Sequence, residues 1–253
     1  MKISIVTVCY NSAATIADTL RSVAAQTHPE VEHIVVDGGS TDDTLEIIAR
    51  HRDRIAQLVS EPDRGVYDAM NKGIALACGE VLAFLNADDV YADAAVLAEI
   101  AAVFADAAVD ACYGDLVYVD SEQGRRIVRY WKSRPFVRGL FARGWVPAHP
   151  TFFARTRLLR EASGFDLRYR FVADFELMLR LLEVHAARSR YVPRVMVRMR
   201  LGGMTNRHWR NVWAQNVEIW QACRRNGIAR TPLPVLRKLW SRLAQFFIRP
   251  AAE

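Results

Sequence analysis

Carboxylates that follow short apolar runs are the residues of this sequence best suited to chemistry. Asp37 follows one such run, Asp63 another, and Asp88 with Asp89 a third. A single aspartate after a strand is usually a helix cap. Helix capping cannot account for all four of these aspartates. Packed together, they would repel one another unless a cation or hydrogen-bond donors neutralised them. Because hard oxygen ligands suit Mg²⁺ and Mn²⁺, the pattern predicts a divalent-cation site that also binds ligand phosphates.

The segments between these carboxylates predict the elements that position them. Apolar, β-branched runs typical of buried strands lie at 3–9, 33–37, 55–60 and 81–85. Helical periodicity follows each run, at 12–26, after Ser40, at 66–77 and at 94–105. Such alternation predicts an α/β fold with a Rossmann-like, mainly parallel sheet flanked by helices. Right-handed crossovers then place the carboxyl end of every strand, and so every carboxylate, at one edge.

The pattern changes after residue 111. We expect strands at 112–119, 126–131 and 191–199, a loop-rich stretch between the second and third, and a helix at 173–185. A further helix, capped by Thr205, is expected to end near Gly227, and Pro232 and Pro234 precede a last one.

Composition excludes several classes of protein. The 253 residues are 51% hydrophobic and 25% charged, a balance that excludes intrinsic disorder. No apolar run is long enough for a membrane span, and we see no signal peptide at the N-terminus. The four cysteines are far apart without C-x-x-C spacing, which argues against a zinc site and favours a reducing compartment.

Charge is divided unevenly along the chain. Residues 1–124 contain 7 basic and 21 acidic residues, a net charge of −14, whereas residues 125–253 contain 27 and 7, a net charge of +20. The acidic half needs a cation to hold a phosphate, and the basic half favours an anionic partner such as nucleic acid, phospholipid or a phosphorylated substrate. The alternative is that arginine-rich elements merely fall late in the chain.

Two nucleotide-binding motifs are absent. No G-x-G-x-x-G follows the first strand and no G-x-x-x-x-G-K-[ST] occurs, which excludes a dinucleotide Rossmann domain and a P-loop NTPase. A nucleotide would have to be bound by carboxylates, one aromatic face and a metal.

Six segments resemble the motifs of the family 2 glycosyltransferases, which have the GT-A fold. Over about residues 1–205 they are residues 6–11 (VTVCYN), 35–42 (VVDGGSTD), 86–89 (NADD), 173–177 (ADFEL), and the acceptor-side pair 149–153 (HPTFF) with 202–205 (GGMT). The resemblance implies a catalytic domain at 1–204, with a nucleotide-sugar-binding half at 1–120 and an acceptor half at 121–204. Basic amphipathic helices at 205–253 would form a C-terminal extension.

The resemblance also implies a role for each donor-side residue. Asp37 and Asp63 would accept hydrogen bonds from uracil or ribose, Tyr10 would lie against the base, and Lys72 would offer charge to the diphosphate. Asp88, with Asp89, would bind the Mn²⁺ or Mg²⁺ that bridges the diphosphate. Asn86 stands where the family's metal motif usually has an aspartate, so it would bond ribose, and the main metal ligand is left open between Asp88 and Asp89.

On the acceptor side, Asp174 is the candidate general base for an inverting transfer. The alternative is that Asp174 only caps the helix that begins there. Glu176 could stand in as the base, but its spacing points it away from Asp174 on that helix. His149 would either touch the acceptor or the metal, or serve a structural role. For Arg180 we favour an ion pair.

The pattern of the C-terminal segment 232–249 predicts a basic amphipathic helix. Its apolar side would contain Leu236, Leu239, Trp240, Leu243 and Phe247. Such a pattern is typical of a helix at a membrane surface, and packing on protein is the alternative.

We therefore expect a cytoplasmic, peripheral-membrane enzyme that transfers sugar from a nucleotide sugar, UDP-linked, to a lipid-linked glycan acceptor in bacterial surface-polysaccharide synthesis. The alternatives are an inactive sugar-nucleotide binder, a nucleotidyltransferase and a nucleic-acid-binding protein; we expect no nucleic-acid partner, because that role leaves the carboxylates unexplained. The sequence does not predict an oligomeric state.

Overall fold

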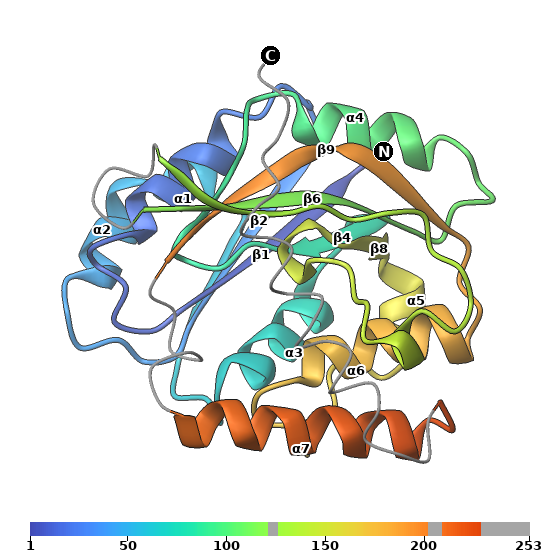
Figure 1. Cartoon of the computed structure of the whole chain (residues 1–253). Coiled ribbons are helices and arrows are strands. Elements are labelled where there is room, and N and C mark those ends of the chain that lie inside the picture. Colours follow the sequence, from blue (N-terminus) through green and yellow to red (C-terminus); the bar gives the residue numbers. More distant parts are fainter. Residues whose placement is uncertain (121–125, 202–208, 229–253) are drawn as a thin grey trace.

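The computed structural model describes residues 1–120, 126–201 and 209–228 (Figure 1). Elements of the first half, in chain order, are β1 (Ile3–Cys9), α1 (Ile16–Ala24), β2 (Val31–Asp37), α2 (Thr44–Arg50), the 3₁₀ turn η1 (Arg52–Arg54), β3 (Gln57–Ser60), α3 (Val66–Leu76), β4 (Val81–Phe84), β5 (Asp89–Tyr91) and α4 (Val96–Phe104). Elements of the second half are β6 (Ala111–Val119), β7 (Ile127–Trp131), the 3₁₀ turns η2 (Phe141–Arg143) and η3 (His149–Thr151), β8 (Phe153–Arg155), α5 (Thr156–Glu161), α6 (Ala173–Leu179), the π-helical turn η4 (Arg180–Val184), β9 (Ser189–Arg200) and α7 (Trp209–Arg225).

The strands form one sheet in the order β3-β2-β1-β4-β8-β6-β9-β5, with β7 paired to β6. Strands β1 to β4 are parallel, and in their register Cys9 lies opposite Asp37, which lies opposite Ser60. The loops after these four strands therefore leave from one edge of the sheet, as predicted. We call these loops the donor edge (residues 10–15, 38–43, 61–65 and 85–88).

The α/β prediction is confirmed, and the second half of the sheet is mixed. β8 runs antiparallel to both β4 and β6, whereas β6 and β9 are parallel to each other. β5 and β7 pair antiparallel with β9 and β6 respectively.

Helices cover both faces of the sheet (Figure 1). α3, α5 and α6 lie on one face with α7 outside α6, and α1, α2 and α4 lie on the other. Alternate residues of β1 contribute to the two cores: Val6 and Val8 pack with α3 and α6, and Ile3 and Ile5 pack with α4. Because both faces are covered, every residue of β1 is buried, which explains its continuous apolar run.

Tertiary contacts change several predicted boundaries. α1 begins at Ile16, with Thr15 as its N-cap. Of the two residues expected to cap it, Asn11 bonds Ser40 in the loop after β2, and the Ser12 N–H donates to Thr44 Oγ1 at the start of α2. The helix predicted at 173–185 is α6 followed by the π-helical turn, which places the Glu183 carboxylate against the main-chain N–H of Gly139, 2.9 Å away. The short elements β5, β8 and α5 were not predicted.

Two predictions fall outside the described residues: the Gly202–Thr205 segment and the amphipathic helix at 232–249. In the part of the chain that the structure describes, no helix is both long and apolar enough to cross a bilayer.

Candidate functional site

Hydrogen bonds join the loops of the donor edge. The main-chain N–H of Asn11 donates to Ser40 Oγ at 2.8 Å, and Asn11 Oδ1 accepts from the N–H of Thr41 at 2.9 Å. Asn11 has a positive φ of 49°, a conformation that asparagine tolerates better than most residues. From the third loop, the Glu61 N–H donates to the Asp37 carbonyl at 3.0 Å. Segments far apart in the sequence thus form one continuous surface.

Asp37 is fully buried beneath this surface. Its carboxylate accepts hydrogen bonds from the N–H groups of Gly39 and Ser40 at 3.1 and 3.0 Å, and from the hydroxyls of Ser40 (2.5 Å) and Ser60 (2.7 Å). Burial raises the pKa of Asp37, but these hydrogen bonds outweigh it and the net pKa lies below its usual value. The ionised Asp37 therefore fixes the turn at residues 38–40, and a direct bond to the donor stays a prediction.

The side chains of Asp63 and Tyr10 both lie close to Gly38. A Cβ atom added to Gly38 would lie 2.5 Å from Asp63 Oδ2 and 3.5 Å from the Tyr10 ring. Asp63 Oδ1 accepts from the Gly65 N–H at 2.7 Å, and the Tyr10 side chain is 60% exposed. Glycine at position 38 is therefore what lets an open aromatic face and a carboxylate approach each other, an arrangement able to stack on a base and accept its N–H.

Lys72 lies below the same loop, on α3. Its ammonium is 2.8 Å from Glu61 Oε1 and donates to the Pro62 carbonyl at 3.3 Å. Because Glu61 is 57% exposed, this pair is open to solvent, where an ion pair contributes little. Lys72 could exchange Glu61 for a phosphate at small cost, and its contact with the diphosphate stays a prediction.

Three oxygen atoms at the fourth loop form no hydrogen bond of regular geometry: Asn86 Oδ1 and both carboxylate oxygens of Asp89. The Asn86 side chain nevertheless lies near enough to Asp89 to act against the rise in its pKa. Asp89 is fully buried, and burial followed by the charge of Asp88 raises its pKa well above the usual range. Asp88 is half-buried, and burial raises its pKa against the opposing charge of Arg200. Asp88 is thus the carboxylate with access to the donor edge, and Asp89 lies behind it.

This set of oxygens fits a divalent cation. Buried oxygen atoms without donors need a positive charge or protons, and Mg²⁺-type sites commonly use one or two carboxylates completed by ligand phosphates. Within the described residues no group of three or more His, Cys, Asp and Glu side chains could bind a metal by itself. A cation at Asp88 would accordingly depend on the phosphates of the donor.

Asp174 is half-buried in the first turn of α6. The N-cap of that helix is Val172, whose side chain makes no capping hydrogen bond. The Asp174 carboxylate instead accepts a hydrogen bond from the Tyr67 hydroxyl, 2.9 Å from Oδ1. The alternative role of Asp174 as a capping residue is therefore not supported, because its hydrogen bond runs to α3.

His149 packs among aromatic rings beside this pair. Its ring stacks on Phe84 with centroids 5.6 Å apart and meets the edge of Phe165 at 5.8 Å. Burial lowers the pKa of His149, and the charge of Asp174 opposes that shift only in part. The imidazole is therefore neutral near pH 7, and its packing agrees with the structural role considered for it.

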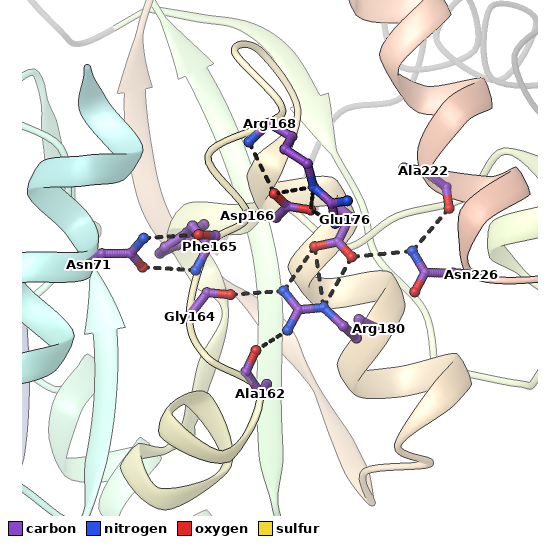
Figure 2. Close-up of polar contacts among 10 residues, drawn as sticks. All are labelled: Asn71, Ala162, Gly164, Phe165, Asp166, Arg168, Glu176, Arg180, Ala222 and Asn226. Atoms are coloured by element: carbon purple, nitrogen blue, oxygen red, sulfur yellow. Dashed lines mark hydrogen bonds and ion pairs between the residues drawn. The ribbon is translucent and has the colours of Figure 1, made fainter. Parts of the chain in front are cut away.

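A polar cluster holds α6 against its neighbours (Figure 2). Arg180 bonds the carboxylate of Glu176 (2.9 Å) and the carbonyls of Ala162 and Gly164, which confirms the ion pair favoured for it. From α7, Asn226 donates to the same Glu176 carboxylate at 3.2 Å. The helix carrying Asp174 is thereby fixed to the preceding loop and to α7.

Comparison with known proteins identifies the family. The model of Glycosyl transferase family 2 matches residues 4–162 of this chain. The chain is a family 2 glycosyltransferase. This glycosyltransferase is 35% identical, over 207 residues, to the PGL/p-HBAD biosynthesis glycosyltransferases of Mycobacterium bovis and Mycobacterium tuberculosis, an alignment covering 80% of this chain and 78% of theirs.

Solved structures share the fold of this glycosyltransferase. S. aureus TarS 1-349, in complex with UDP, superimposes with a TM-score of 0.69 at 21% identity, over 94% of this chain and 71% of the TarS 1-349 chain. The mannosyltransferase PcManGT from Pyrobaculum calidifontis, in complex with GDP-Man and Mn²⁺, gives a TM-score of 0.65 at 19% identity, over 97% and 69% of the two chains. The predicted GT-A-like fold is confirmed.

We expect Arg180→Met to destabilise this glycosyltransferase. The Arg180 side chain is only 18% exposed, and its loss leaves the buried Glu176 carboxylate without its cation. Breaking such a pair costs about 3 kcal/mol or more, to be measured as a lower free energy of unfolding in urea. Arg168→Met is the matched control: Arg168 is 69% exposed and pairs with Asp166, so its loss should leave the free energy of unfolding nearly unchanged. Equal losses in the two variants would contradict the role given to Arg180.

Proposed function

We propose that this glycosyltransferase transfers a sugar from a UDP-sugar to an acceptor hydroxyl with inversion, using a divalent metal, in the synthesis of a bacterial surface glycan or glycolipid. The observation that carries the proposal is that one helix joins the two halves of the reaction. The loop entering α3 contains Asp63, at the donor edge, and the first turn of α3 contains Tyr67, which bonds Asp174. One helix would thus position both the donor and the base.

At the donor edge, each residue has a separate task. The Tyr10 ring would stack on the base, and Asp63 Oδ2 would accept its N–H. Asp37, held ionised by its hydrogen bonds, keeps the turn that brings these two together, and Asn86 would bond ribose. Lys72 would leave Glu61 to meet the diphosphate, so that positive charge lies where the leaving group becomes more negative.

Asp88 would hold Mn²⁺ or Mg²⁺ together with the diphosphate, with Asp89 supporting it from behind. When bound, the metal stabilises the negative charge that develops on the departing nucleoside diphosphate. PcManGT, a protein of the same fold, is seen with GDP-Man and Mn²⁺, and TarS with UDP and with UDP-GlcNAc. These relatives support a nucleotide-sugar donor, and TarS supports the UDP form.

Asp174 would act as the general base. Its Oδ1 faces Tyr67, which leaves Oδ2 for the acceptor hydroxyl. The acceptor O–H bond breaks as its proton passes to Asp174, and the oxygen forms a bond to the anomeric carbon. The bond from that carbon to the diphosphate breaks on the opposite side, and its electron pair leaves with the diphosphate. A single displacement of this kind inverts the anomeric configuration.

The acceptor half offers a basic surface next to α6. Four exposed cations, Lys132, Arg134, Arg138 and Arg143, form no ion pair within the described residues. The loop they occupy packs on the base-bearing helix through Phe141 and Phe175, whose ring centroids are 5.5 Å apart. This surface suits a lipid-linked acceptor at the anionic cytoplasmic face of a membrane. The mycobacterial PGL/p-HBAD biosynthesis relatives support a glycolipid product.

A donor screen tests the proposed function. UDP-glucose, UDP-galactose, their N-acetyl forms and GDP-mannose would be incubated with the full chain, with Mn²⁺ or with EDTA, and release of the nucleoside diphosphate measured. We expect metal-dependent release from one UDP-sugar. Proton NMR of the product should then give an anomeric configuration opposite to that of the donor. Retention of configuration, or release unaffected by EDTA, would rule the proposal out in this form.

A further inference from the structure

The Tyr67 hydroxyl lies between two acceptors. It is 2.9 Å from Asp174 Oδ1 and 3.1 Å from the main-chain carbonyl of Phe171. A tyrosine hydroxyl has one proton to donate and lone pairs with which to accept. It can therefore donate to only one of the two oxygens at a time, and the choice depends on whether Asp174 itself has a proton.

Resting on the proposed role of Asp174 as the base, we propose that Tyr67 is a positioning residue whose hydroxyl serves both protonation states of Asp174. Before the reaction, Tyr67 donates to the ionised carboxylate and holds Oδ1, which directs Oδ2 to the acceptor. After Asp174 has taken the acceptor's proton on Oδ2, Oδ1 is the uncharged oxygen of a carboxylic acid and a weaker acceptor, so the Tyr67 hydroxyl turns to the Phe171 carbonyl instead. Only the hydroxyl hydrogen rotates, and Tyr67 loses no proton.

The side chain of Tyr67 is fixed for this task. Its ring stacks on Phe165 with centroids 5.4 Å apart and planes at 27°. Asn71, one turn further along α3, bonds the main chain of Phe165 twice, at 2.8 and 2.9 Å (Figure 2). The same pair of bonds passes close to Gly164, where an added Cβ would lie 2.3 Å from Asn71 Oδ1. Tyr67 and Asn71 thus bind α3 to the segment leading into α6.

The charged neighbours of the pair favour this arrangement. Burial, followed by the charge of Asp174, raises the pKa of Tyr67 well above its usual value, so Tyr67 stays a donor throughout the working pH range. From η3, His149 is neutral because burial lowers its pKa. From α7, Glu218 accepts the N–H groups of Arg170 and Phe171 at 3.1 and 2.8 Å, and on α6 itself Glu176 is paired with Arg180.

Tyr67→Phe tests the proposal, because it removes the hydroxyl and keeps the stacked ring. A hydrogen bond to the ionised form of an acid favours that form, so its loss moves the titration of Asp174 upward. We expect the acid limb of the kcat profile to move to higher pH by about one unit, and kcat at its plateau to fall about tenfold. Titration of Asp174 by ¹³C-carboxyl NMR, assigned with Asp174→Asn, should show the same upward shift and needs no turnover.

Tyr113→Phe is the matched control. Tyr113 is also buried, and its hydroxyl donates to the Arg134 carbonyl at 2.9 Å, so the variant loses a comparable hydrogen bond elsewhere. Its Asp174 titration should equal that of the wild type. An unshifted Asp174 titration in Tyr67→Phe overturns the proposal, even if the protein is less stable. If the wild type transfers no sugar, the proposed function is wrong. The NMR titration still tests the role of Tyr67, because it does not depend on turnover.

Discussion

Asp174→Asn should lower kcat about a thousandfold, within the range that a general base contributes. The amide has nearly the same shape as the carboxylate and can still accept from Tyr67 through its oxygen, 2.9 Å away in the wild type, so the local fold should persist. An amide cannot take the acceptor's proton. Because Asp174 lies on the acceptor side, UDP affinity should remain within about twofold of the wild type. Both quantities follow from steady-state kinetics and calorimetry.

Asp166→Asn is the control for this variant. Asp166 is a half-buried carboxylate shortly before α6, paired with Arg168, and has no proposed part in the reaction. Its kcat should change by less than about threefold. Asp174→Asn that keeps more than a third of the wild-type kcat would remove Asp174 as the base. Loss of UDP binding in that variant would instead point to a structural role.

Asp88→Asn should reduce kcat/KM at least about a hundredfold at low Mn²⁺ concentration. Asp88 is the half-buried carboxylate at the donor edge, whereas Asp89 is fully buried behind it. Loss of its charge should raise the Mn²⁺ concentration needed for half-maximal activity, so excess metal should restore part of the rate. A Mn²⁺ titration of activity measures both effects.

Asp93→Asn provides a comparison on the same stretch of chain. Asp93 is exposed and pairs with Arg194, away from the buried oxygens of Asn86 and Asp89. Its metal requirement should match that of the wild type. A normal metal requirement in Asp88→Asn, combined with an altered one in Asp89→Asn, would assign the main ligand to Asp89 instead.

Most elements of the donor half could be predicted, because each strand is indicated by residues next to one another in the sequence. The first four strands are short apolar runs, each followed by turn residues, and they appear as β1 to β4 in parallel order. The local pattern did not predict which hydrogen bonds individual side chains form. Asn11 has a good capping side chain, yet its bonds run to Ser40 and Thr41, almost thirty residues away.

Short elements defined by distant partners were missed. β8 has three residues and follows a proline-containing loop, and it exists because Val81 lies opposite Arg155 and Ala111 opposite Ala154. No periodicity can be recognised in so short a segment. β5 is equally short and is paired through β9, about a hundred residues later.

Tyr67, the proposed positioning residue, was not found from the sequence. Within the pattern of α3 it is one more residue of a partly apolar helix face, and its hydrogen-bond partner is 107 positions away. Asp37 illustrates the opposite case. Its position after a strand indicated the donor edge, but only the structure reveals that its oxygens are already bonded by Gly39, Ser40 and Ser60.

Calorimetry of UDP binding, with Mn²⁺ and with EDTA, tests most directly whether the acidic loops after β1 to β4 form one metal-dependent nucleotide site. We expect saturable 1:1 binding with Mn²⁺, at least about tenfold weaker in EDTA, because phosphate must then approach Asp88 and its neighbours without a cation. The Asp63→Asn variant should weaken UDP binding under both conditions. Absence of UDP binding with Mn²⁺, or equal affinity in Mn²⁺ and in EDTA, would contradict the assignment of this edge.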